Sequence, residues 1–312
     1  MWVQIILFLV GLALVVFGAD YLVEGASAVA RKFGLSEFVI GLTIVGMGTS
    51  APEMVVSFIG AAQGNADIAL GNVVGSNIFN LMVVCGVTAI ITPLFIKKES
   101  LRREFPFSIL CAAVLMVFGL IGGEVNRIEG IVLLLMFGGF LAYTVISTKK
   151  ARNAFAAEKA DDKIMPMWQC LLFIVCGGTA IAFGGRMVVN SASEIARPFG
   201  LSDNVIGLTI VALGTSLPEL FTSIVAAKHG EVDIALGNVI GSNIFNILFV
   251  LGIATTISPI SFMMTNTIDC IALIAMSLIV MIFCWTKQTL QRWEGAVMAA
   301  AYTAYIVYIT LR

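Results

Sequence analysis

Charged residues are scarce in this chain of 312 residues, because Asp, Glu, Lys and Arg together make up only 12% of it. A soluble globular domain carries about twice that share. The apolar fraction reaches 59% and the mean hydropathy is +1.02. This composition excludes an ordinary soluble domain and predicts an all-α integral membrane protein, whose surroundings are a lipid bilayer and which has no nucleic acid as a partner.

Histidine is scarcer still, since His229 is the single one in the sequence. A zinc-dependent intramembrane enzyme with an HExxH motif is therefore excluded, and there is no paired catalytic aspartate motif either. The six cysteines lie in apolar segments without paired spacing, which indicates packing rather than metal binding or disulfides. The chain is accordingly predicted to be neither an enzyme nor a cofactor-binding protein.

Apolar segments long enough to cross a bilayer as helices are the main feature of the sequence. The first lacks a basic n-region and a clear cleavage site, so we interpret it as a retained helix. Ten such spans are predicted, leaving no stretch for a soluble domain: 2–22, 38–62, 68–96, 105–123, 130–147, 167–186, 204–227, 234–262, 268–286 and 293–311.

Two sequence blocks occur twice. Residues 34–53 (GLSEFVIGLTIVGMGTSAPE) match residues 200–219 (GLSDNVIGLTIVALGTSLPE) at 15 of 20 positions. Residues 67–80 (DIALGNVVGSNIFN) match residues 233–246 (DIALGNVIGSNIFN) at 13 of 14. Both pairs have the same offset of 166 residues, so the halves align without a gap between the blocks. The chain is therefore an internal duplication.

The duplication divides the chain into a first five-helix repeat at 1–147, a linker at 148–166 and a second five-helix repeat at 167–312. An odd number of spans per repeat inverts the second repeat relative to the first. Of the 18 Lys and Arg residues, 14 fall in connections on the linker's side of the membrane. The positive-inside rule then predicts a multi-pass protein of the cell (plasma or inner) membrane with a cytoplasmic linker and both termini outside. The oligomeric state stays open.

The GTSAPE segment concentrates helix-disturbing features in one turn. Pro52 has no N–H to donate to the carbonyl of Gly48, and its ring crowds that carbonyl. At membrane depth such a carbonyl needs another partner, which is either a bound cation or a neighbouring hydroxyl. Thr49 and Ser50 precede Glu53 by four and three residues, so hydroxyls and carboxylate are expected on one side of the helix. GTSLPE, ending at Glu219, repeats the arrangement.

A second polar stripe follows in each repeat. Its members recur every fourth residue, which places them on one helical face: Asn72, Ser76 and Asn80, and in the second copy Asn238, Ser242 and Asn246. We expect the serines and the last asparagine of each stripe to line the same cavity as the glutamates. Asn77 and Asn243 lie about 100° off the stripe, so ordinary interhelical hydrogen bonds are the favoured interpretation there.

The two glutamates are the central candidates. A buried structural carboxylate, either protonated or paired with a base, is the alternative to a functional one. Burying an ionised acid at bilayer depth costs at least a few kcal/mol, and the apolar stretches around Glu53 and Glu219 hold no Lys, Arg or His. We therefore favour neutralisation by a cation. The candidate ligands are all oxygens, a set that suits Ca²⁺ and Na⁺.

These motifs give the chain a close resemblance to the sodium/calcium exchangers of the cation/calcium exchanger superfamily. GTSAPE with GNVVGSNIFN, and GTSLPE with GNVIGSNIFN, resemble the two α-repeats of that family. The resemblance implies antiport of about three Na⁺ for one Ca²⁺ by alternating access, in a core formed by the second, third, seventh and eighth helices. It also implies that the first and sixth helices slide across this core.

Individual site roles follow from the resemblance. Glu53 and Glu219 resemble the paired calcium ligands, with the backbone oxygens of Thr49 and Thr215 beside them. The flanking sodium sites are implied at four serines and two backbone carbonyls: Ser50, Ser76, Ser216 and Ser242, with Gly46 and Ala212. Asn80 and Asn246 take the remaining central positions.

Three alternatives remain open. Relatives that transport potassium carry Asp at the position of Asn246, so the Asn disfavours a potassium-dependent exchanger. Proton/calcium exchangers usually carry an acid where this chain has Gly75 and Gly241. A cation channel also uses polar stripes and acidic residues, but inverted repeats with Pro-broken helices favour alternating access.

Overall fold

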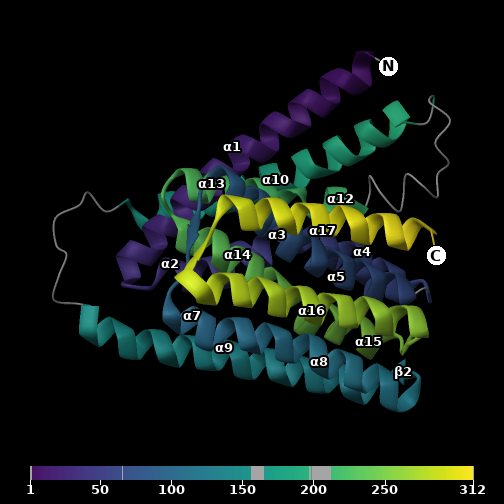
Figure 1. Ribbon diagram of the computed structural model, residues 1–312. Coiled ribbons are helices and arrows are strands. Elements are labelled where there is room, and N and C mark those ends of the chain that lie inside the picture. The colour runs from purple at the N-terminus through teal and green to yellow at the C-terminus, as the bar shows by residue number, and fades with distance from the viewer. Residues whose placement is uncertain (1, 65, 156–164, 197, 199–211, 312) are drawn as a thin grey trace. The chain divides into compact units, whose positions relative to one another are not determined.

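A computed structural model describes residues 2–64, 66–155, 165–196, 198 and 212–311, and Figure 1 shows the order of its elements. Regular structure in these residues is helical except for four two-residue strands. The chain divides into two compact units: a first unit of Met1–Pro52 with Ile146–Asn238, and a second unit of Glu53–Val145 with Val239–Arg312. Each unit therefore contains segments of both predicted repeats.

The first unit is built from helices of both sequence halves: α1 (Trp2–Phe33), α2 (Glu37–Ile40), the π-helix η1 (Gly41–Val45), α3 (Gly46–Thr49), α10 (Met167–Ala196), α12 (Ala212–Thr215) and α13 (Leu217–Lys228). Three helices contribute residues to both units: α4 (Ala51–Ala62), α9 (Arg127–Phe155) and α14 (Val232–Phe245). The predicted linker 148–166 is thus helical up to Phe155, and 156–164 lie outside the described residues.

The second unit contains the remaining elements. Those from the first repeat are α5 (Asp67–Phe79), the π-helix η2 (Asn80–Val84), α6 (Cys85–Ile91), β1 (Leu94–Phe95), α7 (Lys98–Arg102), α8 (Glu104–Gly122) and β2 (Glu124–Val125). Those from the second repeat are the π-helix η5 (Asn246–Val250), α15 (Leu251–Ile257), β3 (Ile260–Ser261), α16 (Met264–Lys287), β4 (Thr289–Leu290) and α17 (Arg292–Leu311).

Helices occupy the predicted spans wherever the structure describes them, but several ends differ. By length and composition seven helices of the described residues qualify as spans, or eight if the broken helix 37–62 counts as one. The third and eighth spans were predicted to run to 96 and 262 but end at Ile91 and Ile257. Pro93 and Pro259 follow these ends closely, and a proline restricts the preceding residue to extended backbone. The seventh span, predicted at 204–227, is described only from Ala212.

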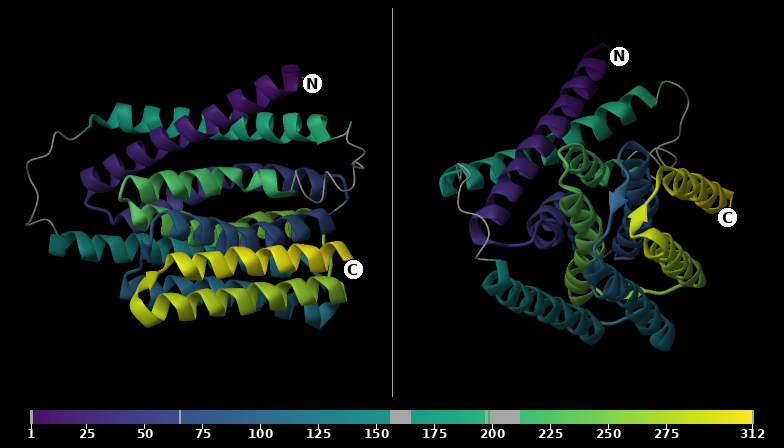
Figure 2. Two further views of the ribbon diagram at one scale, coloured as in Figure 1. Left: turned by 45° about the horizontal axis from the view of Figure 1, so that its top comes forward. Right: turned by 60° about the vertical axis from the view of Figure 1, so that its left-hand side comes forward.

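Within the first unit, α1 and α10 lie side by side (Figures 1 and 2). Their contact is made by small residues spaced seven apart, at Gly11, Gly18 and Gly25 of α1 and at Cys170, Gly177 and Gly184 of α10. A Cβ added at Gly18 would lie 2.8 Å from the carbonyl oxygen of Gly177, and one at Gly177 would lie 2.6 Å from that of Gly18. The backbones therefore approach as closely as only glycine allows, which is the usual basis of tight helix packing in membranes.

Within the second unit, short strands link the two repeats. β1 pairs with β4 and β2 pairs with β3, both antiparallel. Arg292 donates to the carbonyl of Ile91 at 3.5 Å, and Arg127 donates to that of Ile257 at 3.4 Å. Each repeat thus supplies a cation for the last carbonyls of the other repeat's helix, where the helix dipole is negative.

The close approach of α1 and α10 predicts a sharp contrast between two adjacent glycines. In Gly177→Ala the new methyl group meets the backbone of α1, so we expect a loss of about 1–3 kcal/mol in the free energy of unfolding. A methyl group at Gly178 meets no neighbouring atom of the described residues within 4 Å, so Gly178→Ala is expected to be neutral or slightly stabilising. Thermal unfolding of both purified variants in detergent measures the difference. Equal melting temperatures would contradict the glycine contact.

Candidate functional site

The helix that carries GTSAPE is interrupted where the sequence predicted. α3 ends at Thr49, and Ser50 has φ −81° and ψ 9°, outside the helical range, before α4 begins at Ala51. In the second copy Ser216 has φ −92° and ψ 6°, with Pro218 in the first turn of α13. Proline suits a first helical turn because its missing N–H would have no intrahelical partner there. The breaks therefore place Glu53 and Glu219 in the first turn of a new helix.

In the first unit, Glu219 is fully buried and joined to the other repeat by a hydroxyl. The Ser50 hydroxyl donates to Glu219 Oε1 at 2.8 Å. The i,i+3 spacing of Ser50 and Glu53 did not predict this partner, because the helical register is lost at Ser50. Thr49 donates to Asn238 Oδ1 at 3.0 Å. Hydroxyls of the first repeat thus contact the acid and the amide of the second.

In the second unit, Glu53 is also fully buried. The Ser76 hydroxyl donates to Glu53 Oε1 at 3.4 Å, so the two predicted polar stripes of the first repeat do meet. The hydroxyl of Ser76, which donates to Glu53, is neutral, and so is the hydroxyl of Ser50, which donates to Glu219. A neutral donor orients a carboxylate and stabilises its charge but does not cancel that charge.

The backbone carbonyl of each glutamate accepts a hydrogen bond from an asparagine side chain, an amide clamp that was not predicted from the sequence. In the second unit the amide nitrogen of Asn72 donates to the carbonyl of Glu53 at 3.2 Å and to Ser57 Oγ at 3.1 Å. In the first unit Asn238 donates to the carbonyl of Glu219 at 3.2 Å and to Ser223 Oγ at 3.0 Å. The available signal was the recurrence of Ser57 at Ser223, 166 residues later.

Four asparagines form a reciprocal network inside the second unit. The amide nitrogens of Asn77 and Asn243 donate to each other's backbone carbonyl, at 3.1 and 3.2 Å. Their side-chain oxygens accept from the next asparagines: Asn246 donates to Asn77 Oδ1, and Asn80 donates to Asn243 Oδ1, each at 3.2 Å. The interhelical hydrogen bonds expected for Asn77 and Asn243 are therefore present.

A π-helical turn begins at Asn80 and another at Asn246. Such turns are rare and are frequently found at functional sites. Both asparagines are fully buried, and the Oδ1 atom of each lacks a hydrogen-bond partner among the described residues. A buried amide oxygen without a donor is an acceptor suited to a cation.

The structure divides the twelve predicted ligands between the units. The first unit holds Gly46, Thr49, Ser50, Ala212, Thr215, Ser216 and Glu219, and the second holds Glu53, Ser76, Asn80, Ser242 and Asn246. Every one of these whose side-chain burial is described is buried, and no accessible fraction among the polar members exceeds the 8% of Thr215. Side chains that are polar and yet withdrawn from solvent are expected at a ligand site rather than on a solvated face.

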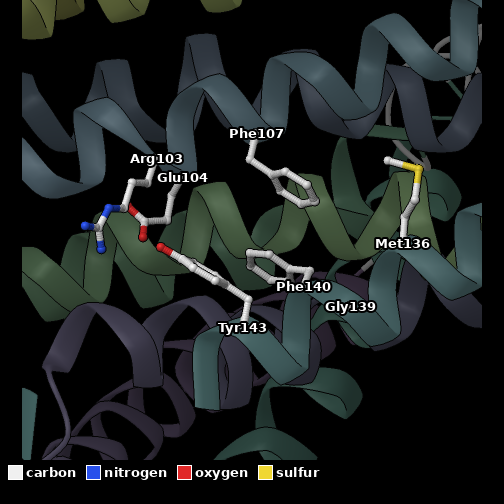
Figure 3. Close-up of a pocket in the computed structure, with 7 residues that line it drawn as sticks. All are labelled: Arg103, Glu104, Phe107, Met136, Gly139, Phe140 and Tyr143. Carbon is white, nitrogen blue, oxygen red and sulfur yellow. The ribbon is translucent and has the colours of Figure 1, made fainter. Parts of the chain in front are cut away.

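A cavity of about 440 Å³ between α8 and α9 in the second unit is a separate feature. Figure 3 shows Arg103, Glu104 and Tyr143 at one end and Phe107, Phe140 and Met136 along it. None of the predicted ion ligands lines this cavity. The positive charge of Arg103 at its polar end also opposes cation binding there.

Comparison with known proteins identifies the family. The sequence profile of the sodium/calcium exchanger protein family matches residues 3–146 and 170–311. The chain belongs to the sodium/calcium exchanger family. It is 34% identical to the sodium/calcium exchanger MaX1 of Methanosarcina acetivorans over 98% of both chains. It is 37% identical to the inner membrane protein YrbG of Escherichia coli, covering 90% of this chain and 88% of that protein.

The fold is shared with a solved exchanger. A structure of the sodium-calcium exchanger NCX_Mj, soaked with Na⁺ and Sr²⁺, matches with a TM-score of 0.85 and 33% identity over 98% of both chains. The prediction of an all-α membrane protein with ten transmembrane helices in inverted repeats is therefore confirmed. The chain is a multi-pass transporter of the cation antiporter class and not an enzyme.

The two amide clamps predict unequal effects on stability. Asn238→Ala removes hydrogen bonds to Thr49, Glu219 and Ser223, whereas Asn72→Ala removes those to Glu53 and Ser57. With about 1 kcal/mol per bond, the Asn238 variant is expected to melt at the lower temperature. Asn238 is also fully buried, while Asn72 is only partly so. Thermal unfolding in detergent measures the order, and equal melting temperatures or the reverse order would contradict this count of hydrogen bonds.

Proposed function

We propose that this chain exchanges Na⁺ for Ca²⁺ by alternating access in the cell (inner) membrane, with about three Na⁺ moved per Ca²⁺. In this proposal extracellular Na⁺ drives Ca²⁺ out of the cytoplasm, both termini lie outside and the linker 148–166 is cytoplasmic. The observation that carries the proposal is the pair of fully buried glutamates at equivalent positions of the family motif. The names of the relatives support Na⁺ and Ca²⁺ as the two transported ions, and NCX_Mj was studied with Na⁺, Ca²⁺ and Sr²⁺.

The proposed ligand set uses only oxygen. Glu53 and Glu219 bind Ca²⁺ together with the backbone oxygens of Thr49 and Thr215. Asn80 and Asn246 contribute neutral oxygens in the centre, where their Oδ1 atoms accept no hydrogen bond from described residues. Sodium occupies flanking positions at four serines and two carbonyls: Ser50, Ser76, Ser216, Ser242, Gly46 and Ala212. Hard cations prefer oxygen ligands of this kind over nitrogen or sulfur.

The direct test is calcium accumulation by purified protein in sodium-loaded liposomes. Dilution into sodium-free buffer is expected to drive uptake of radioactive Ca²⁺ above its external concentration. With the membrane voltage held near zero by potassium and valinomycin, a channel cannot concentrate Ca²⁺, so uphill uptake under this clamp excludes a channel. Liposomes with an outward proton gradient, measured in parallel, detect a proton/calcium exchanger. Liposomes supplied with potassium in addition to sodium detect a potassium-dependent exchanger. Uptake that follows the proton gradient and ignores sodium would overturn the proposal.

Neutralising either glutamate is expected to abolish calcium exchange. Glu53→Gln and Glu219→Gln keep the size and one carbonyl oxygen but remove half of the site's formal charge. Calcium uptake in liposomes should fall by at least about a hundredfold, because each lost charge contact with the ion is worth about 3 kcal/mol or more. Glu124→Gln, at the exposed residue of β2, is the matched control and should transport normally. Normal uptake by either site variant at equal protein abundance would rule out paired ligation.

Exchange is expected to move net charge. A tenfold Na⁺ gradient supplies about 1.4 kcal/mol per ion, and one charge crossing 100 mV adds about 2.3 kcal/mol. Three ions and that charge give about 6.5 kcal/mol, enough for a calcium ratio above about 10⁴. Two ions without net charge would sustain only about a hundredfold ratio.

Calcium flux in liposomes clamped with potassium and valinomycin gives the sodium gradient at which net movement stops. This null point should shift with voltage. A null point that does not move as the voltage changes would mean electroneutral exchange and exclude the 3:1 stoichiometry.

A further inference from the structure

The orientation of an asparagine amide is set by its partners, because its oxygen and its NH₂ group have nearly the same shape. In the reciprocal network of the second unit, the side-chain amides of Asn77 and Asn243 each donate to the backbone carbonyl of the other residue. A carbonyl can only accept, so the group of Asn77 that faces the carbonyl of Asn243 has to be its NH₂. The same holds for Asn243 facing the carbonyl of Asn77. The backbone therefore fixes both side-chain amides.

This constraint passes on to the two candidate ligands. Because the NH₂ group of Asn77 already donates to the backbone, only its Oδ1 atom faces Asn246. Asn246 therefore has to donate to that oxygen through its own NH₂ group. Asn243 imposes the same orientation on Asn80. A flipped amide at Asn80 or Asn246 would set oxygen against oxygen within about 3.2 Å and lose its hydrogen bond. The Oδ1 atoms of Asn80 and Asn246 are thus the ones directed away from the network, and both are buried with no hydrogen-bond donor among the residues that the structure describes.

We propose that Asn77 and Asn243 are positioning residues of the transport site, which hold the side-chain oxygens of Asn80 and Asn246 toward the transported cation. The inference rests on the proposed function and extends it to residues off the polar stripe. Without this network either amide could turn its NH₂ group to the ion, replacing a ligand by a repelling dipole. Outer partners that orient ligands typically change metal affinity about 10–100-fold when removed.

The alternative is a purely structural role, in which Asn77 and Asn243 only hold α5 and α14 together. Both roles predict loss of thermal stability in Asn77→Ala. They differ in how that variant combines with others, since a positioning residue has nothing to position once its ligand is gone. Double-mutant cycles measure this coupling.

The test measures calcium binding to the purified full-length protein by equilibrium ⁴⁵Ca²⁺ binding, alongside its melting temperature. Asn77→Ala and Asn246→Ala are each expected to weaken calcium binding about tenfold or more. The double variant should bind no more weakly than the weaker single variant. Asn243→Ala with Asn80→Ala forms the symmetric cycle and should behave in the same way.

Asn77 and Asn80, whose side chains are not hydrogen-bonded to each other in the network, provide the matched control. Asn80 is oriented by Asn243 and not by Asn77, so the effects of Asn77→Ala and Asn80→Ala on binding should multiply. If Asn77→Ala fails to fold, Asn77→Leu, which keeps most of the volume and cannot accept a hydrogen bond, replaces it. Multiplying effects in both the Asn77–Asn246 and Asn243–Asn80 pairs, or lowered melting temperature with unchanged calcium affinity, would overturn the positioning role. Absence of calcium binding by the parent protein would instead overturn the proposed function.

Discussion

A carboxylate buried at membrane depth has to be compensated, and this constraint governs both units. Glu53 and Glu219 are fully buried, and each accepts a hydrogen bond from a serine hydroxyl. Such donors orient the acids but leave their charge, which is expensive to keep in a medium of low polarity. On the proposed function, cations neutralise it. A transporter that changes sides with both acids uncompensated would carry that electrostatic penalty across the membrane, which explains why ions are exchanged rather than released singly.

The charge on the proposed ligands also bears on the choice of ion. Two carboxylates balance one Ca²⁺, and further acids would over-bind it or require additional cations. On the proposed ligand set, neutral amide oxygens at Asn80 and Asn246 complete the coordination without adding charge. Their usefulness depends on orientation, and in the second unit that orientation derives from backbone carbonyls through Asn77 and Asn243. Two backbone carbonyls, which can only accept hydrogen bonds, thus determine that Asn80 and Asn246 direct their Oδ1 atoms away from the network.

The sequence was sufficient for the features that depend on local chemistry or composition. Hydropathy located the helices, and Pro52 and Pro218 located the breaks at Ser50 and Ser216. It failed where polar residues continue a helix, as in α1 beyond residue 22, because hydropathy reports contact with lipid rather than helical backbone. The strands that follow Pro93 and Pro259 could not be predicted either, since two-residue strands have no periodicity to detect. The bond from Ser50 to Glu219 depends on tertiary packing between segments 169 residues apart.

Reciprocity explains why the two copies remain so similar in one block. In the second unit, Asn77 of the first repeat orients Asn246 of the second, while Asn243 of the second orients Asn80 of the first. The helix ends follow the same rule, since Arg127 and Arg292 each donate to a carbonyl of the other repeat. Neither repeat therefore satisfies these particular buried asparagines and helix-end carbonyls alone. A substitution at one position of the network breaks a hydrogen bond of the other copy, so the same residues are required at the equivalent positions of both copies. The block 67–80 differs from 233–246 at a single apolar position, Val74 against Ile240, where packing and not hydrogen bonding is at stake.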